Sequence, residues 1–164
     1  MKKYAECWRE KGWFDSQPSG GAVTPHTLSP VGEKKDMKDH FRKLKWTIQA
    51  LALPPEEQLR LFPDFVCKAD ELALEYHEAL AVIKGKFWDQ CSPEQKQSLI
   101  ELDKFLDQMS GEVNALSWTD EALRSSPIWV EVRRLALEAL SAFGWPVETP
   151  PLEPAERGTI YVSR

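Results

Sequence analysis

Prolines and glycines divide the middle of the chain, from Asp36 to Gly144, into segments whose apolar residues recur every three or four positions. That interval matches the repeat of an α-helix, so each segment can bury one face and leave the other in water. Polar caps mark several expected helix starts, and a proline or glycine marks most of the ends. The pattern predicts an all-α, compact bundle of about four or five main helices.

The caps and breakers also place the individual helices. They predict helices over about residues 36–53, 63–84, 93–110, 119–125 and 127–143, with a short helical turn at 55–61. Pro63 suits the first helical position, where its missing N–H costs nothing. Ser92 and Gln95 have the spacing of a capping box. In the last helix Val130 and Leu137 lie opposite the main apolar face, so this helix is predicted to be the central one of the bundle.

A length of 164 residues suits a single domain. Residues 1–33, which contain a breaker-rich run at 16–21, are predicted to form an N-terminal arm or linker, with its aromatic residues docked on the domain. Residues 34–146 form the predicted helical domain. Residues 147–164 are rich in proline and are predicted to form an extended C-terminal tail.

The sequence contains no recognisable catalytic or metal-binding motif. Cys7, Cys67 and Cys91 are widely spaced and include no C-x-x-C pair, and no G-x-G-x-x-G run is present. We therefore predict no catalytic residue, no metal site and no cofactor. The sequence leaves open whether the protein is an enzyme but favours a non-catalytic role.

The sequence also lacks a signal for membrane insertion. No run approaches the ~18 apolar residues that a membrane-spanning helix needs. The two lysines near the N-terminus are not followed by the apolar stretch of a secretory signal. The sequence therefore predicts a cytoplasmic protein without a membrane partner.

Charge is distributed unevenly along the chain. Residues 1–45 carry ten Lys/Arg and six Asp/Glu, whereas residues 46–164 carry eleven and twenty. On the second predicted helix four acids fall within about 60° of one another at 100° per residue: Asp64, Glu71, Glu75 and Glu78. This acidic stripe is the candidate surface for a partner protein with a basic surface, because complementary charge speeds association.

Three cations on the first predicted helix, Lys38, Arg42 and Lys45, are the strongest basic feature. Because the body of the chain is acidic, nucleic acid is not expected as a partner.

Two alternatives to protein binding remain open. The first is a helical enzyme or small-ligand domain, because bundles build sites between helices; its candidate pocket contains Tyr76 and His77. The second is a structural or assembly subunit that packs residues 145–162 on a neighbouring copy. The sequence does not determine the ligand, the partner or the oligomeric state.

Parts of the chain resemble short bacterial helical proteins of unknown function. The resemblance covers roughly residues 40–145 and rests on the runs LFPDFV at 61–66, ADELA at 69–73, WTDEALRSSP at 118–127 and VRRL at 132–135. It implies an all-helical fold but no activity or site residue. In size, acidity and fold class the chain is also similar to immunity proteins, which neutralise basic toxins, and this analogy implies a protein inhibitor.

Overall fold

The structure, a computed structural model, describes residues 30–151 of the chain and is all-α over that range, with no strand. The predicted all-α bundle is therefore confirmed. The elements in chain order are α2 (Pro30–Ala52), α3 (Pro55–Arg60), α4 (Lys68–Val82), the π-helix η1 (Ile83–Phe87), the 3₁₀ helix η2 (Trp88–Gln90), α5 (Pro93–Gln108), the 3₁₀ helix η3 (Glu112–Trp118), α6 (Asp120–Ser125) and α7 (Pro127–Phe143).

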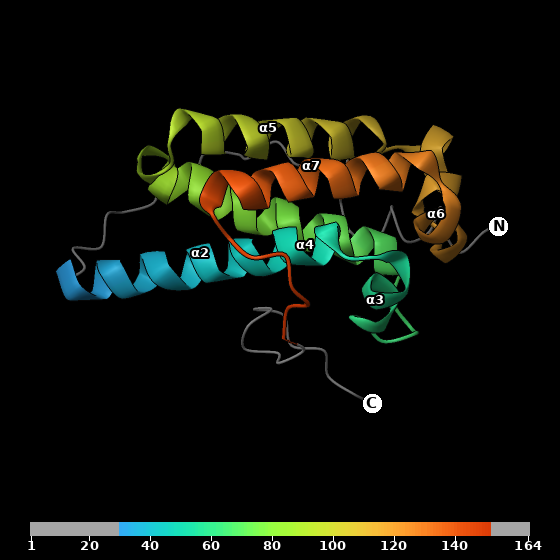
Figure 1. The fold of residues 1–164 in the computed structure, drawn as a ribbon, viewed down its shortest axis with the longest axis horizontal. Helices are drawn as coiled ribbons and strands as arrows, with labels where there is room; N and C mark the ends of the chain where they lie inside the picture. The colour runs from blue at the N-terminus through green and yellow to red at the C-terminus, as the bar shows by residue number, and fades with distance from the viewer. Residues whose placement is uncertain (1–29, 152–164) are drawn as a thin grey trace.

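Four long helices, α2, α4, α5 and α7, form the body of the molecule (Figure 1). Helix α7 packs against both α2 and α5, and α4 packs against α2. The short elements α3, η3 and α6 gather at one end of this bundle, whereas the N-terminal half of α2 projects at the other. Among the described helices none is both long and apolar enough to cross a membrane.

The core consists of the apolar faces that the helical period predicts. Each long helix contributes side chains that are at most 1% exposed: Leu44, Ile48 and Leu51 from α2, Leu72, Tyr76 and Leu80 from α4, Leu99 and Leu102 from α5, and Val132, Ala136 and Ala139 from α7. Burying a leucine-sized side chain stabilises the fold by about 1.5–3 kcal/mol, so these faces dominate the folding energy.

Most of the predicted helix boundaries are confirmed by their caps. The Ser92 hydroxyl accepts a hydrogen bond from Gln95 N at 3.2 Å, and Ser92 N donates to Gln95 Oε1 at 2.8 Å, which completes the capping box. Thr119 caps α6, and Ser126 caps α7, which ends before Gly144. Gly144 adopts a φ of 66°, the left-handed conformation that favours glycine at a helix end.

The prediction that Pro63 opens a helix is wrong. Helix α4 begins at Lys68, and Val66 N donates to Pro63 O in a turn before it. As a result Phe65, which the helical period places on the buried face, is 72% exposed. The local proline rule fails here: residues 63–66 form a turn, and Cys67, directly before α4, contacts a distant part of the chain described below.

The helical backbone does not stop at Gly85 as predicted, although the α-helical part, α4, ends at Val82. The chain continues without a break from α4 into the π-helix η1 and then into η2. A π-helical turn holds more residues than an α-helical turn. The backbone stays helical through Gly85, so this glycine does not end the helix. Helix α2 likewise begins earlier than predicted, at Pro30, so residues 30–33 of the predicted arm are helical.

Residues after α7 form an extended strap across α2. Gln49 Nε2 donates to Pro146 O at 2.9 Å, and Trp46 Nε1 donates to Pro151 O at 2.7 Å. These bonds satisfy the buried Gln49 amide and the indole N–H of the buried Trp46. The rest of the predicted arm and tail, residues 1–29 and 152–164, lies outside the described residues.

Candidate functional site

Residues 61–67, η3 and α6 lie at one end of the bundle, which we call the η3 end (Figure 1). Three large apolar side chains are exposed on these segments. Phe65 is 72% exposed, Val113 is 98% exposed and Leu116 is 70% exposed. A single exposed apolar side chain is ordinary, but several at one end of a molecule mark a candidate interaction site. The η3 end is therefore the candidate functional site.

Two buried tryptophans fix η3 in position. Trp118 Nε1 donates to Met109 O at 2.8 Å, and Trp129 Nε1 donates to Ser117 O at 2.7 Å. The two rings meet edge to face with their centroids 5.7 Å apart, an arrangement that stabilises aromatic pairs. The tryptophans anchor the C-terminal part of η3 to the core, and the side chains of Val113 and Leu116 remain on its solvent side.

Gly111 allows the chain to turn from α5 into η3. Its φ of 104° and ψ of 159° lie in a region that only glycine adopts readily. Asn114 Nδ2 then donates back to Ser110 O at 3.2 Å, which closes the turn over the end of α5. The outward position of η3 is thus set by backbone geometry as well as by the tryptophans.

A sulfur hydrogen bond joins residues 61–67 to η3. Cys67 Sγ donates to Trp118 O at 3.5 Å. On the other side of Cys67, Lys68 Nζ lies 2.9 Å from Asp64 Oδ1. This hydrogen bond and the positive charge of Lys68 lower the pKa of the exposed Asp64 carboxyl group. The contacts hold the loop that carries Phe65 beside η3.

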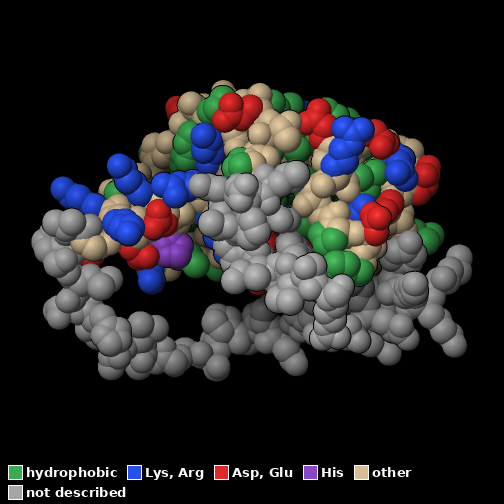
Figure 2. Space-filling view, turned by 90° about the horizontal axis from the view of Figure 1, so that it is seen from below, with side chains coloured by type: hydrophobic (Ala, Val, Ile, Leu, Met, Phe, Trp, Pro, Cys, Tyr) green, Lys and Arg blue, Asp and Glu red, His purple; other side chains and the backbone are tan. Residues whose placement is uncertain are grey.

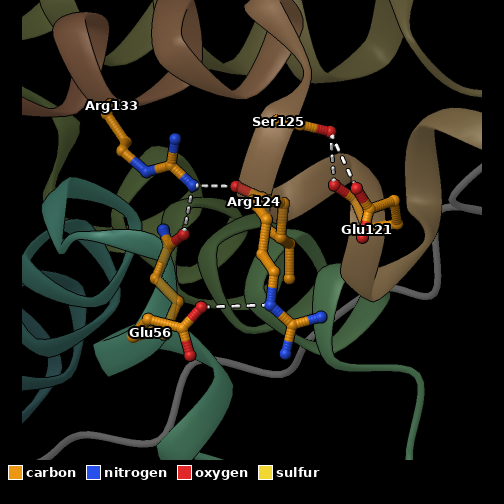
Figure 3. Close-up of polar contacts among 7 residues, drawn as sticks. Glu56, Glu121, Arg124, Ser125 and Arg133 are labelled. Carbon is orange, nitrogen blue, oxygen red and sulfur yellow. Dashed lines mark hydrogen bonds and ion pairs between the residues drawn. The ribbon is translucent and has the colours of Figure 1, made fainter.

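A hydrogen-bond network centred on Arg133 fixes α3 and α6 to the rest of the bundle (Figure 3). Arg133 Nε donates to Leu53 O at 3.0 Å, and its Nη2 donates to Gln58 Oε1 at 2.8 Å and to Leu123 O at 2.5 Å. The buried Gln58 side chain in turn donates to two carbonyls at the end of α2, at 3.1 Å each. Partial burial lowers the pKa of Arg133, but a guanidinium remains charged at neutral pH.

Acids outnumber cations at the η3 end and on the adjoining α3. The acids are Glu56, Glu57, Asp64, Glu112, Asp120 and Glu121, and the cations are Arg60 and Arg124. One ion pair, Arg124 Nε to Glu56 Oε1 at 3.0 Å, joins α6 to α3 at the surface (Figure 3). The candidate site thus combines three exposed apolar side chains with surrounding segments of net negative charge.

The four acids of the predicted stripe differ in their exposure to solvent. Asp64 and Glu78 are exposed, but Glu71 is 7% exposed and Glu75 is 2% exposed. The expectation of one exposed stripe is therefore wrong for Glu71 and Glu75. The angular argument failed because it assumed that α4 has one buried side, whereas side chains around most of its circumference are buried.

His77 lies at a small surface hollow between α4 and α5. The hollow has a volume of about 100 Å³ and is lined by Ala73, His77, Asp103, Lys104, Leu106 and Asp107. His77 Nδ1 is 3.5 Å from Asp103 Oδ1, and Lys84 Nζ is 3.2 Å from Asp103 Oδ2. The hydrogen bond to Asp103 raises the pKa of His77. Burial alone would raise the pKa of Asp103, but its contacts with His77 and Lys84 outweigh this and lower it.

Tyr76 does not share this hollow with His77. Its hydroxyl is buried and donates to Leu99 O at 2.7 Å, and burial raises its pKa. Ligand pockets usually measure about 300–1,000 Å³, so the hollow at His77 is too small for an ordinary organic ligand. The structure therefore does not bring the two predicted pocket residues together in one site.

Neither described cysteine is placed as a nucleophile. Cys91 is buried, and burial raises the pKa of its thiol. Cys67 is half-buried, and its thiol donates a hydrogen bond to a backbone carbonyl. Within residues 30–151 no group of three His, Cys, Asp or Glu side chains is arranged to hold a metal ion. Cys7 lies outside the described residues.

Sequence reasoning missed all three apolar residues of the η3 end. Phe65 was assigned to a buried helix face, and Val113 and Leu116 lie in a seven-residue segment without a helical repeat of its own. One signal was present: a valine and a leucine follow Gly111 outside any predicted helix. The chain matches no known family model, no curated protein and no solved structure. Any proposal about its function therefore depends on its own geometry.

Proposed function

We propose that this chain is a non-catalytic protein-binding module whose η3 end docks on a partner with a basic surface. The observation that supports this proposal is the exposure of Phe65, Val113 and Leu116 at one end of the bundle. Protein interfaces have an apolar centre, often aromatic, surrounded by a polar rim. Three apolar anchors within an acidic surface have this composition.

The surrounding charge defines the chemistry of the partner. A net negative rim accelerates association with a basic protein and disfavours acidic ones. The anchors sit on segments held by the two tryptophans and by the Arg133 network, so little ordering is needed on binding. An immunity-type inhibitor that covers a basic toxin is the form of this function that the size and charge of the chain favour.

The test is site-specific photo-crosslinking in the cells that make the protein. A benzophenone amino acid replaces Val113 at the η3 end, and the matched control replaces Val147, which is 63% exposed on the C-terminal strap. We expect a protein of basic surface to be captured from position 113 and not from position 147. Equal capture from both positions would contradict the proposed surface.

Affinity measurements on the captured partner complete the test. We expect Leu116→Asp to weaken binding by at least tenfold, because a charge would replace an apolar anchor in the interface. The control is Val130→Asp, which replaces another exposed apolar residue (62%) with aspartate on α7. If Leu116→Asp binds as tightly as the unaltered protein, the η3 end is not the docking surface. If the partner is a toxin, co-expression of the unaltered chain restores growth and co-expression of Leu116→Asp does not.

A further inference from the structure

Three exposed cations form a straight row along the N-terminal half of α2. Lys34, Lys38 and Arg42 are spaced i, i+4 and i+8, so they fall within an arc of about 80° and span about 12 Å of the helix. All three side chains are exposed. Figure 2 shows Lys and Arg side chains gathered at this end of the molecule.

Glu33 in the first turn is exposed and lies about 100° around the helix from Lys34, and the other two acids of this segment lie on its other sides. Relative to Lys34, the positions of Asp36 and Asp39 are turned by about 200° and 140° around the helix. Asp36 Oδ1 is 3.1 Å from His40 Nε2, and its Oδ2 is 3.9 Å from Lys86 Nζ, so its charge is directed away from the row. Asp39 lies 3.6 Å from Arg42 at the edge of the row. Within residues 30–151, Lys34 and Lys38 form no ion pair.

The row is also separated from the acidic η3 end. The first turns of α2 project beyond the other helices, and the η3 end lies at the opposite end of the bundle (Figure 1). At physiological salt, charges more than about 8 Å apart in water are largely screened. In physiological salt a large anion can therefore approach the row without strong repulsion from the acidic body, and that repulsion is the reason why the sequence argues against nucleic acid as a partner.

The chemistry of this surface differs from that of the η3 end. Over residues 32–52 of α2 no large apolar side chain is exposed, so the row lacks the anchors that a protein interface requires. Its attraction is purely electrostatic. The cations are about 6 Å apart along the helix axis, which is comparable to the distance between neighbouring phosphates on one nucleic-acid strand. We propose that the Lys34–Lys38–Arg42 row binds the phosphate backbone of duplex nucleic acid without reading its sequence.

Binding of this kind has a defined salt dependence. Three phosphate contacts correspond to a slope of about −2.7 in a plot of log association constant against log salt concentration. No base contact is part of the proposal, so duplexes of different sequence bind equally. This surface is distinct from the one in the proposed function, and either can fail without the other.

The experiment measures fluorescence anisotropy of a labelled 20-base-pair duplex titrated with the full chain, from 20 to 150 mM NaCl. The test variant is Lys34→Gln/Lys38→Gln/Arg42→Gln. The matched control, Arg60→Gln/Lys104→Gln/Arg124→Gln, removes the same charge from exposed positions on other helices. We expect the unaltered chain and the control to bind with a slope near −3. We expect the test variant to bind at least tenfold more weakly at 20 mM NaCl, with a slope reduced by about one per residue replaced.

Four results would overturn the proposal. The first is no binding of the duplex at 20 mM NaCl up to 100 μM protein, and the second is an equal loss of affinity in the test and control variants. The third is tighter binding to poly-glutamate than to the duplex, which would assign the row to an acidic protein. The fourth is tighter binding to phosphatidylserine vesicles, which would assign it to a membrane surface. Circular dichroism verifies that both triple variants remain folded.

Discussion

Replacing Arg133 with methionine tests whether the network beneath the η3 end holds the short helices in place. The change removes three hydrogen bonds, to the carbonyls of Leu53 and Leu123 and to the Gln58 side chain. Methionine keeps much of the apolar stem of arginine, so the change acts mainly on the polar contacts. The three acceptors come from different segments, so their simultaneous loss loosens α3 and α6 together.

The expected cost follows from the number of bonds. Each intramolecular hydrogen bond contributes roughly 1 kcal/mol, so three predict a loss of about 3 kcal/mol in the free energy of unfolding. For a domain of this size that corresponds to a fall in Tm of about 6–12 °C. Lysine at position 133 keeps one charged donor but lacks the planar fork of arginine. The free energy of unfolding of Arg133→Lys should therefore lie between those of the unaltered chain and Arg133→Met.

The neighbouring arginine supplies the control. Arg134 is exposed and pairs with Glu131 and Glu138 on the surface of α7, and exposed ion pairs contribute little to stability. Urea unfolding followed by circular dichroism and by tryptophan fluorescence gives the free energy for each variant. Equal losses in Arg133→Met and Arg134→Met would refute the reasoning, because the network would then contribute no more than a surface pair.

Two further predictions concern the turn into η3 and the histidine at the hollow. Gly111→Ala should destabilise the fold by about 1–3 kcal/mol in urea unfolding, because alanine is strained at a φ of 104°. The control is Gly85→Ala, which should not destabilise the fold because a Cβ at this position meets open space. Equal losses of stability in the two variants would exclude backbone strain as the cause. The pKa of His77 is raised in the folded state, so its contribution is fully present below the unfolded pKa and is lost as pH rises through the folded pKa. The stability difference between the unaltered chain and His77→Gln should therefore shrink from pH 5.5 to pH 8.5 in urea unfolding, and a pH-independent difference would contradict the His77–Asp103 pairing.

Local rules predicted most of the bundle because the responsible interactions lie within a few residues. The capping box of Ser92 and the caps at Thr119 and Ser126 depend on neighbours two or three positions away. The prediction failed where distant contacts decide. Helix α4 starts at Lys68 rather than Pro63, beside a contact between Cys67 and Trp118, 51 residues apart. That difference moved Phe65 from the predicted core to the surface.

The candidate site was harder to predict than the fold for the same reason. An apolar residue outside a helical repeat can be buried or exposed, and the sequence alone does not distinguish the two. Val130 and Leu137 show the same error as Phe65: their apolar character predicts burial, yet they are 62% and 41% exposed, although α7 itself packs against both α2 and α5. The charged row on α2 was partly visible, because Arg42 and Lys38 lie one turn apart. The projection of that helix beyond the bundle required the structure.

The two proposed surfaces should act independently. The 23 residues of α2 span about 34 Å, so its projecting start lies far from the η3 end compared with the ~8 Å over which charges interact in physiological salt. The long helices between them have closely packed apolar faces rather than mobile charged ones. In physiological salt, charge bound at one end therefore does not change the affinity of the other end for its ligand. The triple change on α2 should leave partner capture at Val113 unaltered, and Leu116→Asp should leave the salt slope for duplex binding unaltered. Coupling between the two measurements would mean that both ligands contact one continuous surface.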